Sequence, residues 1–143
     1  MTTPASNADR QRLAEARRWV IKVGSALLTD DGRGLDASVV KQLAGQLAAL
    51  RSQGREVVLV SSGAIVAGLA RLNLAERPHE VHLSQAAAAV GQSALVRAYE
   101  EHLSPHGVTT AQILLSHADV RARDRYLNAR STLSTLLGMA VLP

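Results

Sequence analysis

The 143-residue sequence contains no cysteine. Without thiols, the chain has no disulfide framework, no thiolate metal site and no cysteine nucleophile. Aromatic residues make up only 2% of the sequence and phenylalanine is absent, so Ala, Val, Leu and Ile must build the core. So few aromatic side chains argue against the stacking platforms with which proteins bind single-stranded nucleic acid.

Long apolar runs are also missing, since none reaches the roughly 18 residues of a membrane-spanning helix. The opening stretch MTTPASNADRQRLAEARR lacks an apolar signal-peptide core and contains acidic residues, which argues against a transit peptide as well. We therefore expect a cytoplasmic protein that does not bind membranes, with residues 1–17 as a flexible leader.

Charge of one sign is not concentrated anywhere in the sequence. The net charge is +4, with 47% hydrophobic and 20% charged residues, which is an ordinary composition for a globular domain. A small positive charge attracts anions weakly, and a nucleotide suits it as well as a nucleic acid does. No block of like charge is long enough to predict a nucleic-acid-binding arm.

What is present is an alternation of strand-like and helix-like segments. This order predicts an α/β fold, a three-layer sandwich with a mainly parallel open sheet and helices on both faces. The turn-forming stretch TDDGRG covers residues 29–34, and the sequence stops on Pro143 just as a strand begins, so we expect the fold to be truncated. The expected strands are 19–23, 55–60, 108–115 and 139–142, and the expected helices are 35–53, one opened by residues 61–64, 81–103 and 118–137.

The stretch WVIKVGSALLT places Lys22 inside an otherwise apolar strand. A near-continuous apolar run is typical of a parallel strand covered on both faces, and an unpaired buried charge is costly. Two interpretations stay open from the residues alone: an edge lysine paired with a carboxylate, or a lysine that binds an anion such as a phosphate. Gly24 and Ser25 follow at once and can offer backbone donors to the same anion.

The stretch SSGA, residues 61–64, follows the second expected strand and opens a helix. In open α/β sheets, ligands bind beyond the carboxyl ends of the strands, and a helix N-terminus attracts anions. The alternative is plain helix capping by Ser61 or Ser62. A serine hydrolase that uses Ser62 is a remote third interpretation, because SSGA is not GxSxG. The scattered histidines give no metal-ligand spacing, so we expect no metal site in the protein itself.

Four motifs carry a resemblance to a known family: WVIKVGSALLT, VLVSSGAIVAGLARL, QAAAAVGQSAL and DRYLNARSTLSTLL. In this order they resemble the amino-terminal part of the glutamate 5-kinases, which belong to the amino acid kinase family. The resemblance covers nearly all of residues 18–143. It implies the amino acid kinase fold and transfer of the ATP γ-phosphoryl group to the γ-carboxylate of L-glutamate, the first step of proline biosynthesis, with Mg²⁺ bound mainly through the nucleotide phosphates.

The resemblance also implies roles for the residues singled out above. Contacts to the ATP phosphates would come from Lys22, Gly24 and Ser25, with Lys22 also stabilising the transferring group. The glutamate substrate would be held by Ser62, Gly63 and Ala64. If Lys22 has this role, it is expected to be buried for its charge, with the nucleotide as its partner. The family resemblance further implies a homo-oligomer.

Parts of the family's pattern have no counterpart in these 143 residues. The family continues into an Asn-Glu-Asn-Asp loop, a nucleotide-binding second half and often a PUA domain. We therefore expect the isolated chain to be incomplete and inactive as a kinase. The alternatives left open are a sister enzyme such as acetylglutamate kinase, and a non-catalytic fragment or binding module.

Overall fold

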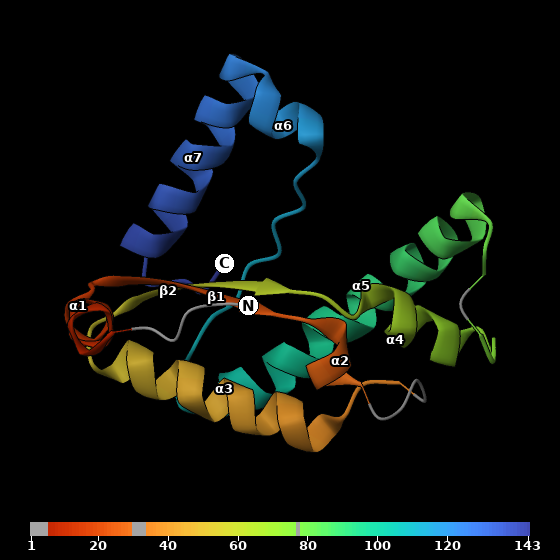
Figure 1. The fold of residues 1–143 in the computed structure, drawn as a ribbon, viewed down its shortest axis with the longest axis horizontal. Coiled ribbons are helices and arrows are strands. Elements are labelled where there is room, and N and C mark those ends of the chain that lie inside the picture. The colour runs from red at the N-terminus through yellow and green to blue at the C-terminus, as the bar shows by residue number, and fades with distance from the viewer. Residues whose placement is uncertain (1–5, 30–33, 77) are drawn as a thin grey trace.

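The computed structural model of the chain describes residues 6–29, 34–76 and 78–143. Figure 1 shows a small parallel sheet with helices packed beneath one face and a pair of helices that projects away on the other side. The elements, in chain order, are α1 (Asn7–Glu15), β1 (Arg18–Val23), α2 (Ser25–Leu28), α3 (Ala37–Ser52), β2 (Glu56–Ser61), α4 (Ala64–Arg71), α5 (Val81–Leu103), η1 (Ser104–His106), α6 (His117–Arg121) and α7 (Arg123–Gly138).

The sheet consists of β1 and β2, which pair in parallel from Arg18↔Glu56 to Val23↔Ser61. These are the first two strands expected from the sequence, and the α/β class with parallel pairing is confirmed. Side chains alternate between the faces of a strand, and on β1 the core-facing side ends at the buried Val23. On the opposite face Val20 is 66% exposed. The expectation that the first strand is covered on both faces is therefore wrong.

The third and fourth expected strands, residues 108–115 and 139–142, do not form as strands. Within the described part of the chain they are reduced to one parallel bridge between Thr110 and Leu142. The Leu142 N–H donates to the Thr109 carbonyl at 2.8 Å, and the Leu59 N–H of β2 donates to the Pro143 carbonyl at 2.9 Å. A strand needs a partner along its whole length, and here the partner extends over only a few residues.

Helices α3 and α5 supply most of the core beneath the sheet. Helix α3 begins at the N-cap Asp36, whose carboxylate accepts hydrogen bonds from the Ser38 hydroxyl and from the Ser38 and Val39 N–H groups. These hydrogen bonds, that of the Ser38 hydroxyl first, lower the pKa of Asp36. Buried positions recur at helical spacing on both helices. They are Val40, Ala44, Leu47 and Ala48 on α3, and Ala87, Gly91, Leu95, Tyr99 and Leu103 on α5.

Helices α4 and α5 cross in direct backbone contact, which two glycines make possible. A Cβ atom added at Gly68 of α4 would overlap the Ala87 carbonyl oxygen. A Cβ atom added at Gly91 of α5 would overlap the Ala64 carbonyl oxygen and the Gly68 nitrogen. The crossing therefore fixes the position of α4 relative to α5 without any side chain between them.

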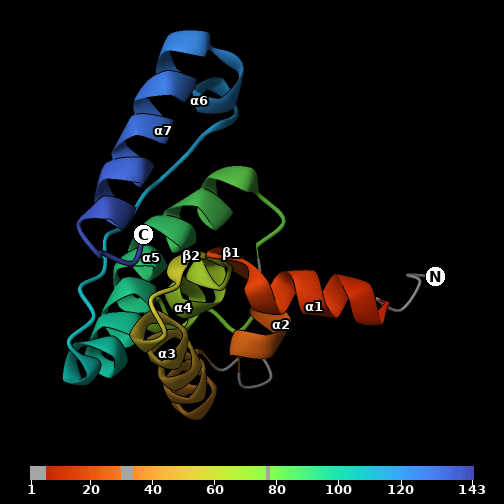
Figure 2. The ribbon, with the colours of Figure 1, turned by 90° about the vertical axis from the view of Figure 1, so that its left-hand side faces the viewer.

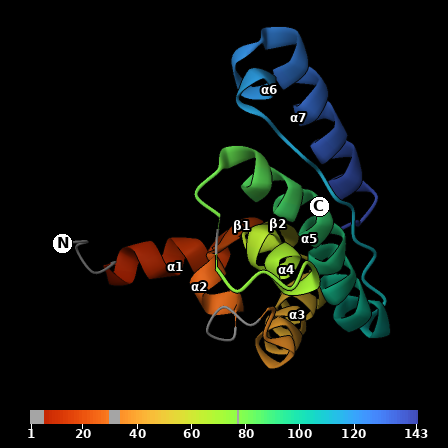
Figure 3. The same ribbon diagram turned by 90° about the vertical axis from the view of Figure 1, so that its right-hand side faces the viewer.

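The single helix expected over residues 118–137 is instead divided into α6 and α7. Ala122, between them, has φ −79° and ψ 122°, an extended conformation, and Ser116 with Asp119 forms a capping box at the start of α6. Figures 2 and 3 show the α6–α7 pair projecting away from the rest of the molecule. Of the residues of α7, only Leu137 is buried.

The expected leader, residues 1–17, contains α1, which has a capping box between Ser6 and Asp9 and no buried residue. Its flexibility stays a prediction. The Arg55 guanidinium donates to the carbonyls of Ala14, Glu15 and Ala16 at the end of α1. No helix in the described ranges is both long and apolar enough to cross a bilayer. The turn expected at residues 29–34 lies mostly outside the described residues.

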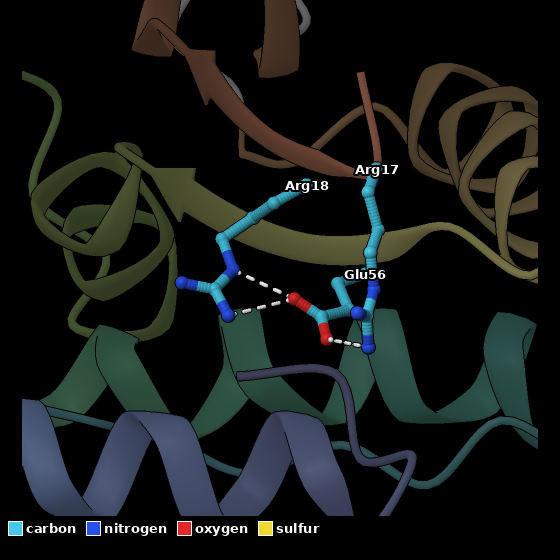
Figure 4. A network of polar contacts seen from close by, with 3 residues as sticks. All are labelled: Arg17, Arg18 and Glu56. Carbon is cyan, nitrogen blue, oxygen red and sulfur yellow. Dashed lines mark hydrogen bonds and ion pairs between the residues drawn. The ribbon is translucent and has the colours of Figure 1, made fainter. Parts of the chain in front are cut away.

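The exposed face of the sheet carries an ion-pair network near the start of both strands, drawn in Figure 4. The Arg17 guanidinium lies 3.0 Å from Glu56 Oε1, and the Arg18 guanidinium lies 2.7 Å from Oε2. The Arg18 hydrogen bond is the main reason why the pKa of Glu56 is lowered. This network lies at the end of the strands opposite to the candidate site.

Candidate functional site

Parallel pairing brings the two glycine-containing stretches together at the carboxyl edge of the sheet. Val23, the last residue of β1, is in register with Ser61, the last residue of β2. The Ser62 N–H then donates to the Val23 carbonyl at 2.9 Å. The loop at residues 23–25 and the loop at residues 61–64 are therefore neighbours, as expected for ligand-binding loops of an open α/β sheet.

Lys22 is exposed in the structure, so the expectation that it is buried is wrong. The physical reason is the alternation of β1: Lys22 shares the uncovered face with Val20. Its Nζ atom lies 3.6 Å from the position that a Cβ atom would take on Gly24. The ammonium group therefore lies beside Gly24, the residue before the exposed Ser25 that begins α2.

Gly63 determines the shape of the second loop. It is the N-cap of α4 with φ 110° and ψ −7°, a backbone conformation that is strongly disfavoured for residues other than glycine. It is buried, and an added Cβ atom would lie 3.5 Å from Leu35 Cδ2 and 3.7 Å from Leu28 Cδ1. These are ordinary van der Waals distances, so the backbone conformation, and not the packing, favours glycine here.

The capping interpretation of Ser61 and Ser62 is wrong, because the N-cap is Gly63 and no side chain makes a capping hydrogen bond there. Helix α4 therefore presents the N–H groups of its first turn, beginning at Ala64, without a capping side chain. These groups and the helix dipole give this end of α4 a partial positive charge. Together with the Lys22 ammonium, the carboxyl edge of the sheet is suited to bind anions.

Tyr99 also lies in this region, and no pattern in the sequence singles it out. It is 6% exposed, and its hydroxyl oxygen lies 2.9 Å from Ser61 Oγ. Burial raises the pKa of Tyr99, and the hydrogen bond with Ser61 opposes that shift. The helical spacing of α5 predicts only that Tyr99 faces the core, and its partner lies 38 residues away in the sequence.

An open cleft of about 590 Å³ adjoins the first turn of α4. The sequence did not predict this cleft either, because its lining comes from three separate segments: α4, the segment before α5 and the start of α5. Within the described residues, no group of three or more His, Asp or Glu side chains is placed to hold a metal ion. The residues that line the cleft are Ile65, Pro78, His79, Val81, Ser84 and Gln85.

Comparison with known proteins agrees with the motifs. Residues 17–143 match the amino acid kinase family. The chain is 59% identical to the glutamate 5-kinase of Ralstonia nicotianae over 134 residues, 94% of this chain and 36% of that protein. It is 60% identical to the glutamate 5-kinase of an Azoarcus species and 59% identical to that of Thioalkalivibrio sulfidiphilus, with the same coverage.

The chain thus spans about a third of the length of the curated relatives it matches, 36% in each of these three. The matched region contains both loops at the carboxyl edge of the sheet. Because the family match extends over residues 17–143, the chain belongs to the amino acid kinase family.

Proposed function

We propose that this chain carries part of the site that transfers the γ-phosphoryl group of ATP to the γ-carboxylate of L-glutamate. The relatives that support this proposal are named glutamate 5-kinase. The observation that carries it is the pairing of the two loops, in which the Ser62 N–H donates to the Val23 carbonyl. This places an exposed lysine and the N-terminus of α4 at one edge of the sheet.

The proposed reaction suits a site without a general base. A glutamate carboxylate has an unperturbed pKa of about 4.3, so it is already ionised and nucleophilic at neutral pH. The protein must bring two anions together, align them and offset their charge. Basic side chains and backbone N–H donors can do this, and the candidate loops offer both.

We propose that Lys22, Gly24 and Ser25 hold the nucleotide phosphates, with Lys22 stabilising the group in transfer. These residues fit phosphate chemically, since the Lys22 ammonium extends over Gly24 and no side chain of Gly24 stands in its way. ATP supplies the phosphoryl group in this reaction. Mg²⁺ would be held mainly through the nucleotide phosphates.

We propose that Ser62, Gly63 and Ala64 hold the glutamate substrate. The first-turn N–H groups of α4 lack a capping side chain and suit a carboxylate. The cleft beside Ile65 has room for a small amino acid. Residues 1–17 are proposed as a leader and residues 18–143 as the amino-terminal part of a kinase domain, in a cytoplasmic, homo-oligomeric protein.

The assay that tests this proposal measures hydroxamate formation from L-glutamate, Mg-ATP and hydroxylamine, which traps the acyl phosphate. We infer that the 143-residue chain alone gives no turnover, because it covers 36% of each relative. A chimera is therefore needed, in which this chain replaces the matching segment of the Ralstonia nicotianae relative. It should form hydroxamate from L-glutamate, and not from acetylglutamate or aspartate.

Lys22→Ala in the chimera should lower turnover about 10²–10³-fold, the usual cost of removing one preorganised electrostatic contact to a transition state. The matched control is Lys41→Ala, because Lys41 is an exposed lysine of α3 and should leave turnover unchanged. A folded, ATP-binding chimera without activity would refute the proposed function. Equal activities of the two lysine variants would refute the role of Lys22. Turnover by the 143-residue chain alone, lost in Lys22→Ala, would refute its incompleteness.

A further inference from the structure

The two tyrosines of the described chain are in opposite environments. Tyr126 on α7 is 47% exposed, whereas Tyr99 on α5 is 6% exposed and belongs to the core cluster. The hydroxyl of Tyr99 lies 2.9 Å from Ser61 Oγ, at the carboxyl end of β2. A buried hydroxyl needs a hydrogen-bond partner, and here that partner is the residue directly before the proposed substrate loop.

The direction of the hydrogen bonds follows from proton counting. Ser61 Oγ donates to the Ser62 carbonyl oxygen at 3.1 Å. A serine hydroxyl carries a single proton, so when Ser61 donates to the Ser62 carbonyl, the Tyr99 hydroxyl is the donor to Ser61. The three groups form a chain from the Tyr99 hydroxyl through the Ser61 hydroxyl to the Ser62 carbonyl. Successive hydrogen bonds of this kind polarise and strengthen one another.

This chain of hydrogen bonds determines how the Ser62–Gly63 peptide is oriented. The peptide is trans, and in a planar trans peptide the C=O and N–H bonds point in opposite directions. Because the Ser62 carbonyl points toward Ser61, the Gly63 N–H points away from it. Among the hydrogen bonds found between described residues, none is donated by the Gly63 N–H.

We propose that Tyr99 is a positioning residue, which acts through Ser61 to direct the Gly63 N–H toward the carboxylate of a bound amino-acid substrate. This rests on the proposed function, in which residues 62–64 hold glutamate. Removing the Tyr99 and Ser61 hydroxyls together leaves neither hydroxyl unpaired, so we expect the free energy of unfolding to change little. The expected consequence of the hydrogen bonds is therefore the orientation of one peptide group.

The first experiment uses the ligand-free 143-residue chain and ¹H–¹⁵N NMR. Tyr99→Phe should shift the Gly63 amide resonance and raise the exchange rate of the Ser62 amide, which donates to the Val23 carbonyl, about fivefold, the equivalent of one hydrogen bond of ~1 kcal/mol. Ser61→Ala should do the same, and the double variant should add little. Tyr126→Phe is the matched control and should leave both amides unchanged.

The second experiment titrates the same five proteins, the wild type and the four variants, with L-glutamate and follows the same resonances. The Kd should rise about fivefold in Tyr99→Phe and stay unchanged in Tyr126→Phe, while the urea midpoint of the double variant stays near that of the wild type. Amides that respond equally to both tyrosine variants would overturn the positioning role. If the amides respond as expected and no variant binds L-glutamate, the positioning stands and substrate binding by this chain is refuted.

Discussion

Gly91→Ala is the substitution with the sharpest structural expectation. The added methyl group would overlap the Ala64 carbonyl oxygen and the Gly68 nitrogen. These are backbone atoms of α4, which cannot turn aside as a flexible side chain can. The two helices must therefore move apart, and Ala64 at the start of α4 must move with them.

The magnitude follows from two opposing terms. Forcing an extra methyl group into a well-packed core costs typically about 1–3 kcal/mol. Replacing glycine by alanine inside a helix stabilises the helix by up to about 1 kcal/mol, because alanine has the higher helix propensity. We therefore expect Gly91→Ala to lower the free energy of unfolding by about 1–2 kcal/mol. Gly68→Ala should behave alike, because its added Cβ atom would overlap the Ala87 carbonyl oxygen.

The matched control is Gly45→Ala on α3, where an added Cβ atom meets nothing within 4 Å. Only the propensity term applies there, so Gly45→Ala should raise the free energy of unfolding by up to about 1 kcal/mol. Urea denaturation monitored by circular dichroism measures both variants against the wild type. If Gly91→Ala stabilises the chain as Gly45→Ala does, the close α4–α5 crossing is refuted.

Two other substitutions give expected results in the same assay. Ala140 has φ +59° in the turn after α7, where the Ala140 N–H donates to the Leu137 carbonyl and the Val141 N–H donates to the Leu136 carbonyl. Because glycine adopts this conformation without strain, Ala140→Gly should raise the free energy of unfolding by about 0.5–1 kcal/mol. An unchanged free energy of unfolding would contradict the left-handed turn. Arginine contacts lower the pKa of Glu56 from 4.5, so they stabilise the fold above that value and the effect is lost as the pH falls through the lowered pKa. The advantage of the wild type over Glu56→Gln should therefore be present at about pH 6 and shrink toward pH 3, whereas a constant difference would refute it.

The sequence was sufficient for features that depend on local pattern. The stretch SQAAAAVGQSALVRAYEEHL, followed by Pro105 and Gly107, predicted a helix over about residues 81–103, and these are the bounds of α5. Short β-branched runs predicted β1 and β2, each to within one residue of its observed bounds. The rule that ligands bind beyond the carboxyl ends of the strands also singled out the two loops that are neighbours in the structure. The roles of the residues in those loops stay predictions.

The features that the sequence did not predict depend on contacts between distant segments. Lys22 is exposed because one face of β1 is uncovered, and local sequence does not say which face a helix covers. Residues 108–115 have the composition of a strand, yet strand formation requires a partner, and only Thr110 has one. The break at Ala122 has neither glycine nor proline nearby to mark it.

The buried stripe of α5 links these observations, although no candidate binding residue lies on it. Gly91 contacts the Ala64 carbonyl and so determines where α4 begins. Tyr99, two turns further along the same face, is hydrogen-bonded to Ser61 and so determines where β2 ends. The loop at residues 61–64 is thus held at both ends by one helix. Since a rigid helix keeps these two contacts at a fixed separation, α5 acts as the template for the proposed substrate loop, and changes in its buried face should reach the site before they unfold the chain.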